Sequence, residues 1–118
     1  MESRGQVVKA MALIERPRDG ALLVSEGPNP TGELFHRPLG GHVEFGEYAV
    51  DTVRREFDEE IGQELVGVRM AGVLENIFQW DGSIQHEIAF IFLAGFADPD
   101  AYEITEQSVQ DARKATRV

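Results

Sequence analysis

Apolar side chains recur at helical spacing between residues 48 and 61. This segment contains no Gly or Pro. Its apolar positions lie three or four residues apart: Val50, Val53, Phe57 and Ile61. At about 100° per residue these side chains share one stripe of a helix. Gly62 follows where a helix favours a left-handed residue at its C-terminal end. The pattern predicts an amphipathic helix from Tyr48 to Ile61.

Extended segments are predicted on both sides of this helix. Residues 6–15 and 21–25 are apolar and are separated by the turn sequence Arg-Pro-Arg-Asp-Gly, which predicts a hairpin. Residues 65–80 alternate loosely between apolar and polar and end at Asp-Gly, beyond which residues 86–97 are apolar and aromatic. This second pair predicts two long strands joined by a tight turn.

The remaining segments are shorter. Residues 26–32 hold two Pro, two Gly and an Asn, which predicts a loop. Residues 34–38 predict a short extended piece. The helix and the strands together predict a mixed β-sheet with helices packed against it, an α/β fold. With 118 residues, of which 42% are hydrophobic, the chain has room for a single domain, 1–118.

The C-terminal tail, about 98–118, has a weaker pattern. Its first residues predict a turn, and Thr105 or Ser108 is placed to cap a short helix that carries Val109 and Ala112. The apolar stripe of this helix is thin. We therefore hypothesise that a second subunit covers the exposed face of the sheet in a homodimer, which sedimentation at micromolar concentration tests.

Three carboxylates lie together on the predicted helix. Glu56, Glu59 and Glu60 have the spacing i, i+3 and i+4, so they meet beside the apolar stripe. Like charges at this spacing destabilise a helix by about 0.2–0.5 kcal/mol per pair, and acids in a last turn oppose the helix dipole. A hard divalent cation such as Mg²⁺ or Mn²⁺ would offset this cost. The alternative is a solvated acidic face.

The residues around the helix favour the metal. Gly40 and Gly41 allow the backbone to approach a bound group, and Gly46 allows a tight entry into the helix. Gly41, five residues, Glu47, seven residues and then Arg-Glu-Phe-Asp-Glu-Glu-Ile-Gly from Arg55 resemble the signature box of the Nudix hydrolases, the MutT-like family. Every charged and glycine position of that box is present. Two apolar positions depart from it, because Phe57 is aromatic and Gln63 stands where the box closes with an aliphatic residue.

The resemblance implies a fold and a function. The fold would be the Nudix-type α/β/α sandwich with a mixed β-sheet and the loop-helix-loop of the box. The function would be metal-dependent hydrolysis of a diphosphate bond in a nucleoside diphosphate linked to another group. The resemblance is strongest over about residues 35–62 and fades after about residue 97.

The resemblance also implies roles for single residues. Glu56 and Glu60 would bind Mg²⁺ or Mn²⁺, with Glu59 as a third ligand or as the base. A carbonyl of Gly40 or Gly41 would add a backbone ligand, and Arg55 with Glu47 would orient Glu56. Three further residues are candidates for binding the substrate: Phe35, Glu44 and Trp80. For the two aromatic residues, packing within the sheet is the alternative.

Acids outside the box are a further group of candidates, because many relatives of this family take a base or an extra ligand from elsewhere in the chain. Four such acids remain possible here: Glu75, Glu87, Glu103 and Glu106. Because the chain has a net charge of −10, at least three of them are better explained as surface acids.

Charge and composition exclude several classes of function. The chain has 11 basic and 21 acidic residues, so neither a long nucleic acid nor an anionic membrane is expected as a partner. It has no cysteine, which excludes disulfides and thiol chemistry. No apolar run reaches the roughly 18–20 residues of a membrane span, and the first residues do not have the pattern of a signal peptide. We therefore expect a cytoplasmic protein.

Two classes of function remain. The first is the hydrolase, acting on a small nucleoside diphosphate derivative. The second is a non-catalytic module that binds a nucleotide on the same fold. Such a module would be free to lose its carboxylates, whereas this chain keeps all of them. The identity of the derivative is not encoded in the box, because loops and strand side chains select the base, the sugar or the second group.

Overall fold

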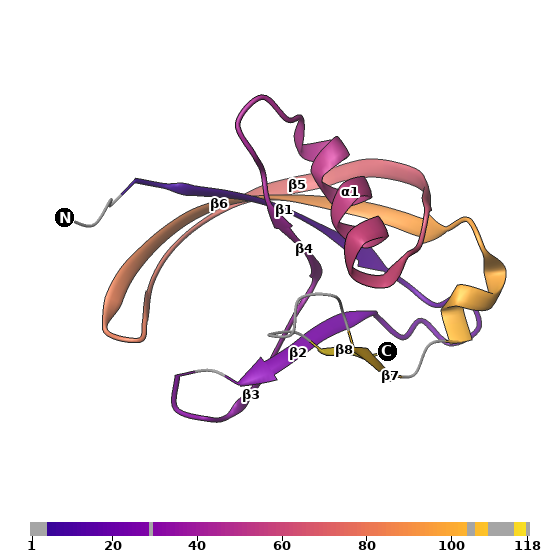
Figure 1. Ribbon diagram of the computed structural model, residues 1–118, viewed down its shortest axis with the longest axis horizontal. Coiled ribbons are helices and arrows are strands. Elements are labelled where there is room, and N and C mark those ends of the chain that lie inside the picture. The colour runs from indigo at the N-terminus through magenta and orange to yellow at the C-terminus, as the bar shows by residue number, and fades with distance from the viewer. Residues whose placement is uncertain (1–4, 29, 104–105, 109–114, 118) are drawn as a thin grey trace.

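The computed structural model describes residues 5–28, 30–103, 106–108 and 115–117. The main sheet has four strands in the order β4-β1-β6-β5 (Figure 1). Its strands are β1 (Val7–Ile14), β4 (Leu39–His42), β5 (Leu65–Trp80) and β6 (Ser83–Phe96). Because β1 runs parallel to β6 and antiparallel to β4, the sheet is mixed, as predicted.

A second four-stranded sheet has the order β3-β2-β8-β7. Its strands are β2 (Val24–Pro28), β3 (Leu34–Arg37), β7 (Glu106–Ser108) and β8 (Ala115–Arg117). The predicted short extended piece at 34–38 is therefore confirmed. In Figure 1 this sheet lies below the main sheet, and the chain passes from it directly into β4.

The predicted helix is confirmed as α1 (Ala49–Ile61), with Tyr48 as its N-cap residue and Gly62 as a left-handed C-cap. The Gly62 N–H donates to the Asp58 carbonyl, which satisfies one of the last carbonyls of the helix. The predicted stripe faces the core, where Val53 and Phe57 are fully buried. Among the described residues, α1 is the one α-helix.

Small residues on β1 make room for the helix. Ala10 and Ala12 are fully buried in the core cluster that also contains Phe57 and Phe92. The aromatic Phe57, unusual for the signature box, is accommodated against Phe96, with ring centroids 6.3 Å apart. The departure from the box is therefore absorbed by packing and leaves the helix in place.

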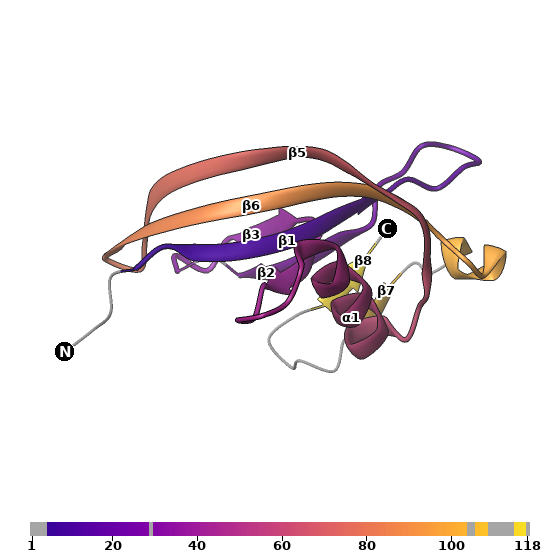
Figure 2. The ribbon, with the colours of Figure 1, turned by 90° about the horizontal axis from the view of Figure 1, so that it is seen from above.

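The long hairpin after the helix is also confirmed. Asp81 and Gly82 form its two-residue turn, and both have positive φ, 52° and 80°. This is the backbone that Asp-Gly favours between two antiparallel strands. β6 begins at Ser83, three residues before the predicted start. In Figures 1 and 2 the β5–β6 hairpin extends well beyond α1.

The predicted hairpin between residues 6–15 and 21–25 is wrong in its pairing. The turn forms, since the Arg16 N–H donates to the Ala21 carbonyl, but only the bridge between Glu15 and Leu22 follows it. Both edges of β1 are already paired, one with β4 and the other with β6. The segment after the turn therefore does not pair along β1 and instead forms β2 of the second sheet. Residues 26–28, predicted as loop, belong to β2 there.

The tail differs from its prediction as far as the structure describes it. The predicted turn at 98–101 is a bend at Asp98 followed by a 3₁₀-helix, Pro99–Glu103. Residues 106–108 form a strand, so the predicted helix does not include them. Thr105, Val109 and Ala112, which were assigned to that helix, lie outside the described residues.

The outer strand of the main sheet exposes apolar side chains. β5 is an edge strand that pairs with β6 on one side. Its exposed large side chains are Val66, Met70, Val73, Leu74, Ile77 and Phe78. β5 contains neither Lys nor Pro, the residues that commonly protect a sheet edge.

Across the described parts of the chain, no helix has the length and apolar character needed to cross a membrane.

Candidate functional site

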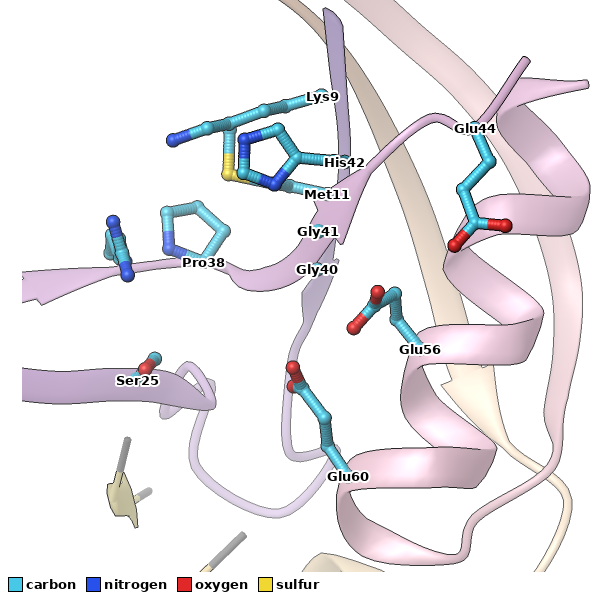
Figure 3. Close-up of a pocket in the computed structure, with 11 residues that line it drawn as sticks. Lys9, Met11, Ser25, Pro38, Gly40, Gly41, His42, Glu44, Glu56 and Glu60 are labelled. Carbon is cyan, nitrogen blue, oxygen red and sulfur yellow. The ribbon is translucent and has the colours of Figure 1, made fainter. Parts of the chain in front are cut away.

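The acidic helix and the glycine strand line one cavity of about 430 Å³. Glu56 and Glu60 enter it from α1, and Gly40 and Gly41 enter it from β4. Figure 3 shows both carboxylates pointing from the helix toward the two glycines. Glu60 is only 5% exposed, which is rare for a carboxylate. The cavity therefore brings together two of the three predicted acidic ligands and both predicted backbone positions.

The two glycines are required by close packing. The strand register places Gly40 opposite Met11 and Gly41 opposite Ala10 on β1. A Cβ at Gly40 would collide with the backbone of β1, and a Cβ at Gly41 would collide with the carboxylate of Glu56. The Glu56 carboxylate therefore lies directly against the backbone of β4. No other residue type leaves that space open.

Arg55 is held by several acceptors beside the cavity. Its Nε and Nη2 donate to the two carboxylate oxygens of Glu47, at 2.8 and 3.0 Å. Its Nη1 donates to Glu56 Oε1 at 3.1 Å, and Nη2 also donates to the carbonyl of His42 at 3.2 Å. The fork on Glu47 fixes the guanidinium plane, so Arg55 contacts Glu56 from a defined direction.

Glu47 is the acid that holds this arginine. Besides Arg55, it accepts a hydrogen bond of 2.7 Å from the hydroxyl of Thr52. Hydrogen bonds from Arg55 and Thr52 lower the pKa of Glu47 to about 2. The same contacts raise the pKa of Arg55, mainly through its hydrogen bonds to Glu47. Thr52 is fully buried, and no sequence motif pointed to it.

Glu59 and Glu44 lie at the margins of this cavity. Glu59 does not line it; its side chain is 56% exposed and accepts a hydrogen bond of 3.2 Å from Arg55 Nη1. Glu44 lines the cavity from the loop before α1, 3.9 Å from Arg55 Nη2. Its backbone N–H donates to Glu47. The roles predicted for both residues stay predictions.

The donors of the cavity fit a hard divalent cation. Two carboxylates and the adjacent peptide backbone supply oxygen ligands only, which Mg²⁺ and Mn²⁺ prefer. Within the described residues, however, no three His, Cys, Asp or Glu side chains are grouped closely enough to hold a metal ion. Glu56 and Glu60 alone would leave coordination positions for water and substrate phosphates, which is the usual arrangement for Mg²⁺.

A second cavity of about 390 Å³ continues from the first. Both cavities are lined by the same five residues: Lys9, Met11, Arg37, Pro38 and His42. Phe35 and Trp80, predicted to bind substrate, both line the second cavity. Their rings pack edge to face, with centroids 5.5 Å apart. The two cavities form one groove with an acidic end and an aromatic end.

Sequence reasoning missed two cations in this groove. Lys9 on β1 and Arg37 on β3 lie where the two cavities meet. Neither belongs to a motif. The alternation along β1 was the available signal, because it places Lys9 on the face opposite the buried Ala10.

The four candidate acids outside the box differ in whether they line the groove. Glu87 lines the second cavity and pairs with Lys9 at 3.0 Å. Glu75 pairs with His86 at 3.0 Å and Glu103 with Arg18 at 3.5 Å, and neither acid lines either cavity of the groove. The side chain of Glu106 is outside what the structure describes.

Solved structures of other proteins share this fold. A NUDIX hydrolase from Nitrosomonas europaea superposes with a TM-score of 0.66 at 20% identity, covering 96% of this chain and 72% of that protein. A MutT NUDIX hydrolase from Burkholderia pseudomallei gives 0.65 at 24% identity, covering 94% and 78%. A MutT structure from a study of the Aliivibrio salmonicida and Vibrio cholerae proteins gives 0.59 at 17% identity, covering 95% of this chain and 77% of that protein. At these identities the likeness shows the fold.

The fold and the site define an α/β protein in which a glycine strand faces an acidic helix across a cavity. The model of the NUDIX domain family matches residues 5–115, and the chain belongs to that family. The resemblance seen in the signature box is therefore confirmed, together with the α/β fold and its mixed sheet. Members of this family are usually pyrophosphohydrolases, and they typically use divalent metal ions.

Proposed function

We propose that this chain hydrolyses a diphosphate bond in a nucleoside diphosphate linked to another group, with Mg²⁺ or Mn²⁺. One observation carries the proposal: Glu56 and Glu60 point into the same cavity as the backbone of Gly40 and Gly41. Hard oxygen donors thus lie at one end of a groove whose second cavity, of about 390 Å³, is in the size range of small-molecule sites.

The residues of the site have separate tasks in this proposal. Glu56 and Glu60 would hold the metal, with a carbonyl of Gly40 or Gly41, and Glu59 would be a further ligand or the base. When bound, a divalent ion neutralises charge on the phosphoryl oxygens and lowers the pKa of a bound water. Arg55 keeps the Glu56 carboxylate in place through its 3.1 Å hydrogen bond.

The groove orients the substrate in this proposal. Lys9 and Arg37 supply positive charge next to the acidic end, where phosphate groups would lie. Phe35 and Trp80 offer flat apolar surface at the other end, which suits an aromatic ring. Glu44, on the loop before α1, would contact the group on the far side of the phosphates.

A non-catalytic nucleotide-binding module is the alternative. It would need the cations and the aromatic end of the groove but not the buried Glu60 or the fork between Arg55 and Glu47. Burying a carboxylate costs free energy unless its charge is compensated, and a bound cation compensates it. The retained acids favour the hydrolase.

The test is release of phosphate or nucleotide from a panel of nucleoside diphosphate derivatives, with Mg²⁺, with Mn²⁺ and with chelator. We expect at least one compound to be cleaved with metal and none with chelator. Cleavage that survives chelation would contradict the metal role. A panel without any cleavage, combined with a nucleotide that raises the Tm, would favour the binding module.

We also propose that the chain forms a homodimer, and we place the contact at the edge of β5, not across the face of the sheet as expected from the sequence. A second copy brings the same unpaired edge, and two such edges can pair antiparallel about a twofold axis. The pairing would cover Val73 and Ile77, which are half or more exposed. We expect a dimer in sedimentation velocity at micromolar concentration and a monomer for Ile77→Lys. A monomeric wild type would contradict the proposal.

A further inference from the structure

Glu87 is a carboxylate inside the groove that the proposed chemistry does not use. It stands on β6 and lines the aromatic cavity, not the acidic one. Its Oε2 lies 3.0 Å from Lys9 Nζ, and the side chains of Lys9 and Glu87 are 22% and 13% exposed. Lys9 lines both cavities. Lys9 therefore lies where the two cavities meet, and Glu87 lies at the aromatic end of the groove.

The position of Glu87 says which part of a substrate lies beside it. A carboxylate repels phosphate oxygens, most strongly where both are partly removed from water. At the acidic cavity the proposed metal ion would offset this repulsion, whereas Glu87 has no such ion in the proposal, so the phosphate groups belong on the side of Lys9 that faces the acidic cavity. The group beside Glu87 must be uncharged or cationic, and the rings of Phe35, Phe78 and Trp80 around the same cavity favour a flat aromatic group.

Glu87 also limits the hydrogen-bonding pattern of that group. An ionised carboxylate only accepts hydrogen bonds, and it has about four lone-pair sites, of which Lys9 takes one. Guanine offers an amino group beside a ring N–H, whereas adenine and cytosine offer an amino group each. Uracil offers one N–H between two carbonyl oxygens, which face a carboxylate unfavourably. A group that offers no donor to the remaining lone pairs of Glu87 removes them from water without replacing their hydrogen bonds, which lowers the affinity.

We propose that Glu87 is a specificity-determining residue that selects a nucleobase with an exocyclic amino group. Lys9 holds the Glu87 carboxylate at the aromatic end, and Gln85, which lines the same cavity, adds a donor and an acceptor beside it. This proposal rests on the proposed function, which places the phosphates at the acidic end of the groove. It goes beyond that function by naming the chemical class of the base.

The chain carries its own probe for this subsite. Trp80 is its only tryptophan and lines the aromatic cavity. Titrating nucleoside 5′-monophosphates in the presence of chelator, and following Trp80 fluorescence, measures base binding without hydrolysis. We expect GMP, AMP and CMP to bind the wild type at least about tenfold more tightly than UMP, because a good pairing of this kind discriminates by about that factor or more.

Glu87→Gln is the variant that tests the residue. Its amide can donate to the carbonyl oxygens of uracil, so the preference over UMP should fall to about threefold or less. Glu103→Gln is the matched control: it removes the same charge and breaks an ion pair with Arg18, but Glu103 lines neither cavity. The Glu103→Gln variant should prefer GMP, AMP and CMP over UMP to the same degree as the wild type does.

The outcomes test the role of Glu87 separately from the proposed hydrolase activity. A wild type that binds UMP as tightly as the other three nucleotides overturns it, and so does Glu87→Gln with an unchanged preference. Because the wild-type comparison needs no variant, a variant that fails to fold leaves the test intact. Preference among bases without any metal-dependent cleavage would refute the hydrolase alone. Cleavage without preference among bases would refute the role of Glu87 alone.

Discussion

We expect Glu56→Gln and Glu60→Gln each to lower the proposed metal-dependent hydrolysis by about two orders of magnitude or more while the fold persists. Both carboxylates line the acidic cavity, and Gln keeps their shape but removes the charge that attracts the cation. Because no three His, Cys, Asp or Glu side chains among the described residues are grouped to hold a metal ion, we expect each of these two carboxylates to supply a large share of the proposed binding.

A second measurement separates metal binding from other causes of inactivity. A divalent ion that binds only the folded protein raises its Tm, and the rise grows with the ion concentration. Wild type should show this rise with Mn²⁺, and each variant should lose most of it. Asp58→Asn is the matched control, because Asp58 is an exposed acid of the same helix. Near-normal turnover in either Gln variant would refute the assignment of that residue.

The helix could be predicted because its signals are local: the stripe of Val53 and Phe57 and the left-handed Gly62 follow from residues close in sequence. The ion pair of Arg55 with Glu47 was instead implied by the resemblance to the signature box. The long strands of the β5–β6 hairpin were predictable for the same reason, through the Asp-Gly turn.

The position of Glu59 was not predictable from spacing. On a helix, Glu60 lies about 40° to one side of Glu56 and Glu59 about 60° to the other. Spacing gives this separation but not the side on which β4 packs. In the structure β4 lies on the side of Glu60, so Glu60 is buried in the cavity and Glu59 stays exposed beside Arg55.

The groove depends on contacts that are distant in sequence. Lys9 and Glu87 become partners because β1 runs parallel to β6, with Val7 opposite Glu87. Glu75 and Glu87 carry the same charge on neighbouring strands, yet only Glu87 lines a cavity. The register between β5 and β6 decides this, because Glu75 lies opposite Ile88 and shares its sheet face, whereas Glu87 is on the other face.

We expect Arg55→Lys to lower kcat by about ten- to a hundredfold with little change in KM, the usual effect of losing a residue that orients a ligand. Lysine keeps the charge but has no fork, so it cannot bind both oxygens of Glu47 and still reach Glu56. Glu47→Gln should have a smaller effect of the same kind. A kcat for Arg55→Lys equal to that of the wild type would show that the fork does not position Glu56.

The ion pair of Arg55 and Glu47 also makes the stability of the folded protein depend on pH, in the range between about pH 2 and pH 4.5. The pKa of Glu47 is about 2 in the folded protein, below its ordinary value of 4.5. The folded state therefore binds this proton less readily, and the pair stabilises it fully above about pH 4.5. That contribution is lost as the pH falls from about 4.5 to about 2. The Tm of Glu47→Gln should lie below that of the wild type at pH 7, and the difference should shrink in acid.

Asp19 provides the control that separates stability from catalysis. Its two oxygens accept hydrogen bonds of 2.9 Å from Arg16, which lower the pKa of Asp19 to about 2 as well. It lies in the turn after β1 and lines neither cavity of the groove. Asp19→Asn should therefore reproduce the pH-dependent loss in Tm while kcat stays at the wild-type value. If Asp19→Asn lowers kcat as much as Glu47→Gln does, the activity lost with Glu47 reflects stability, and Glu47 has no specific role in holding Arg55.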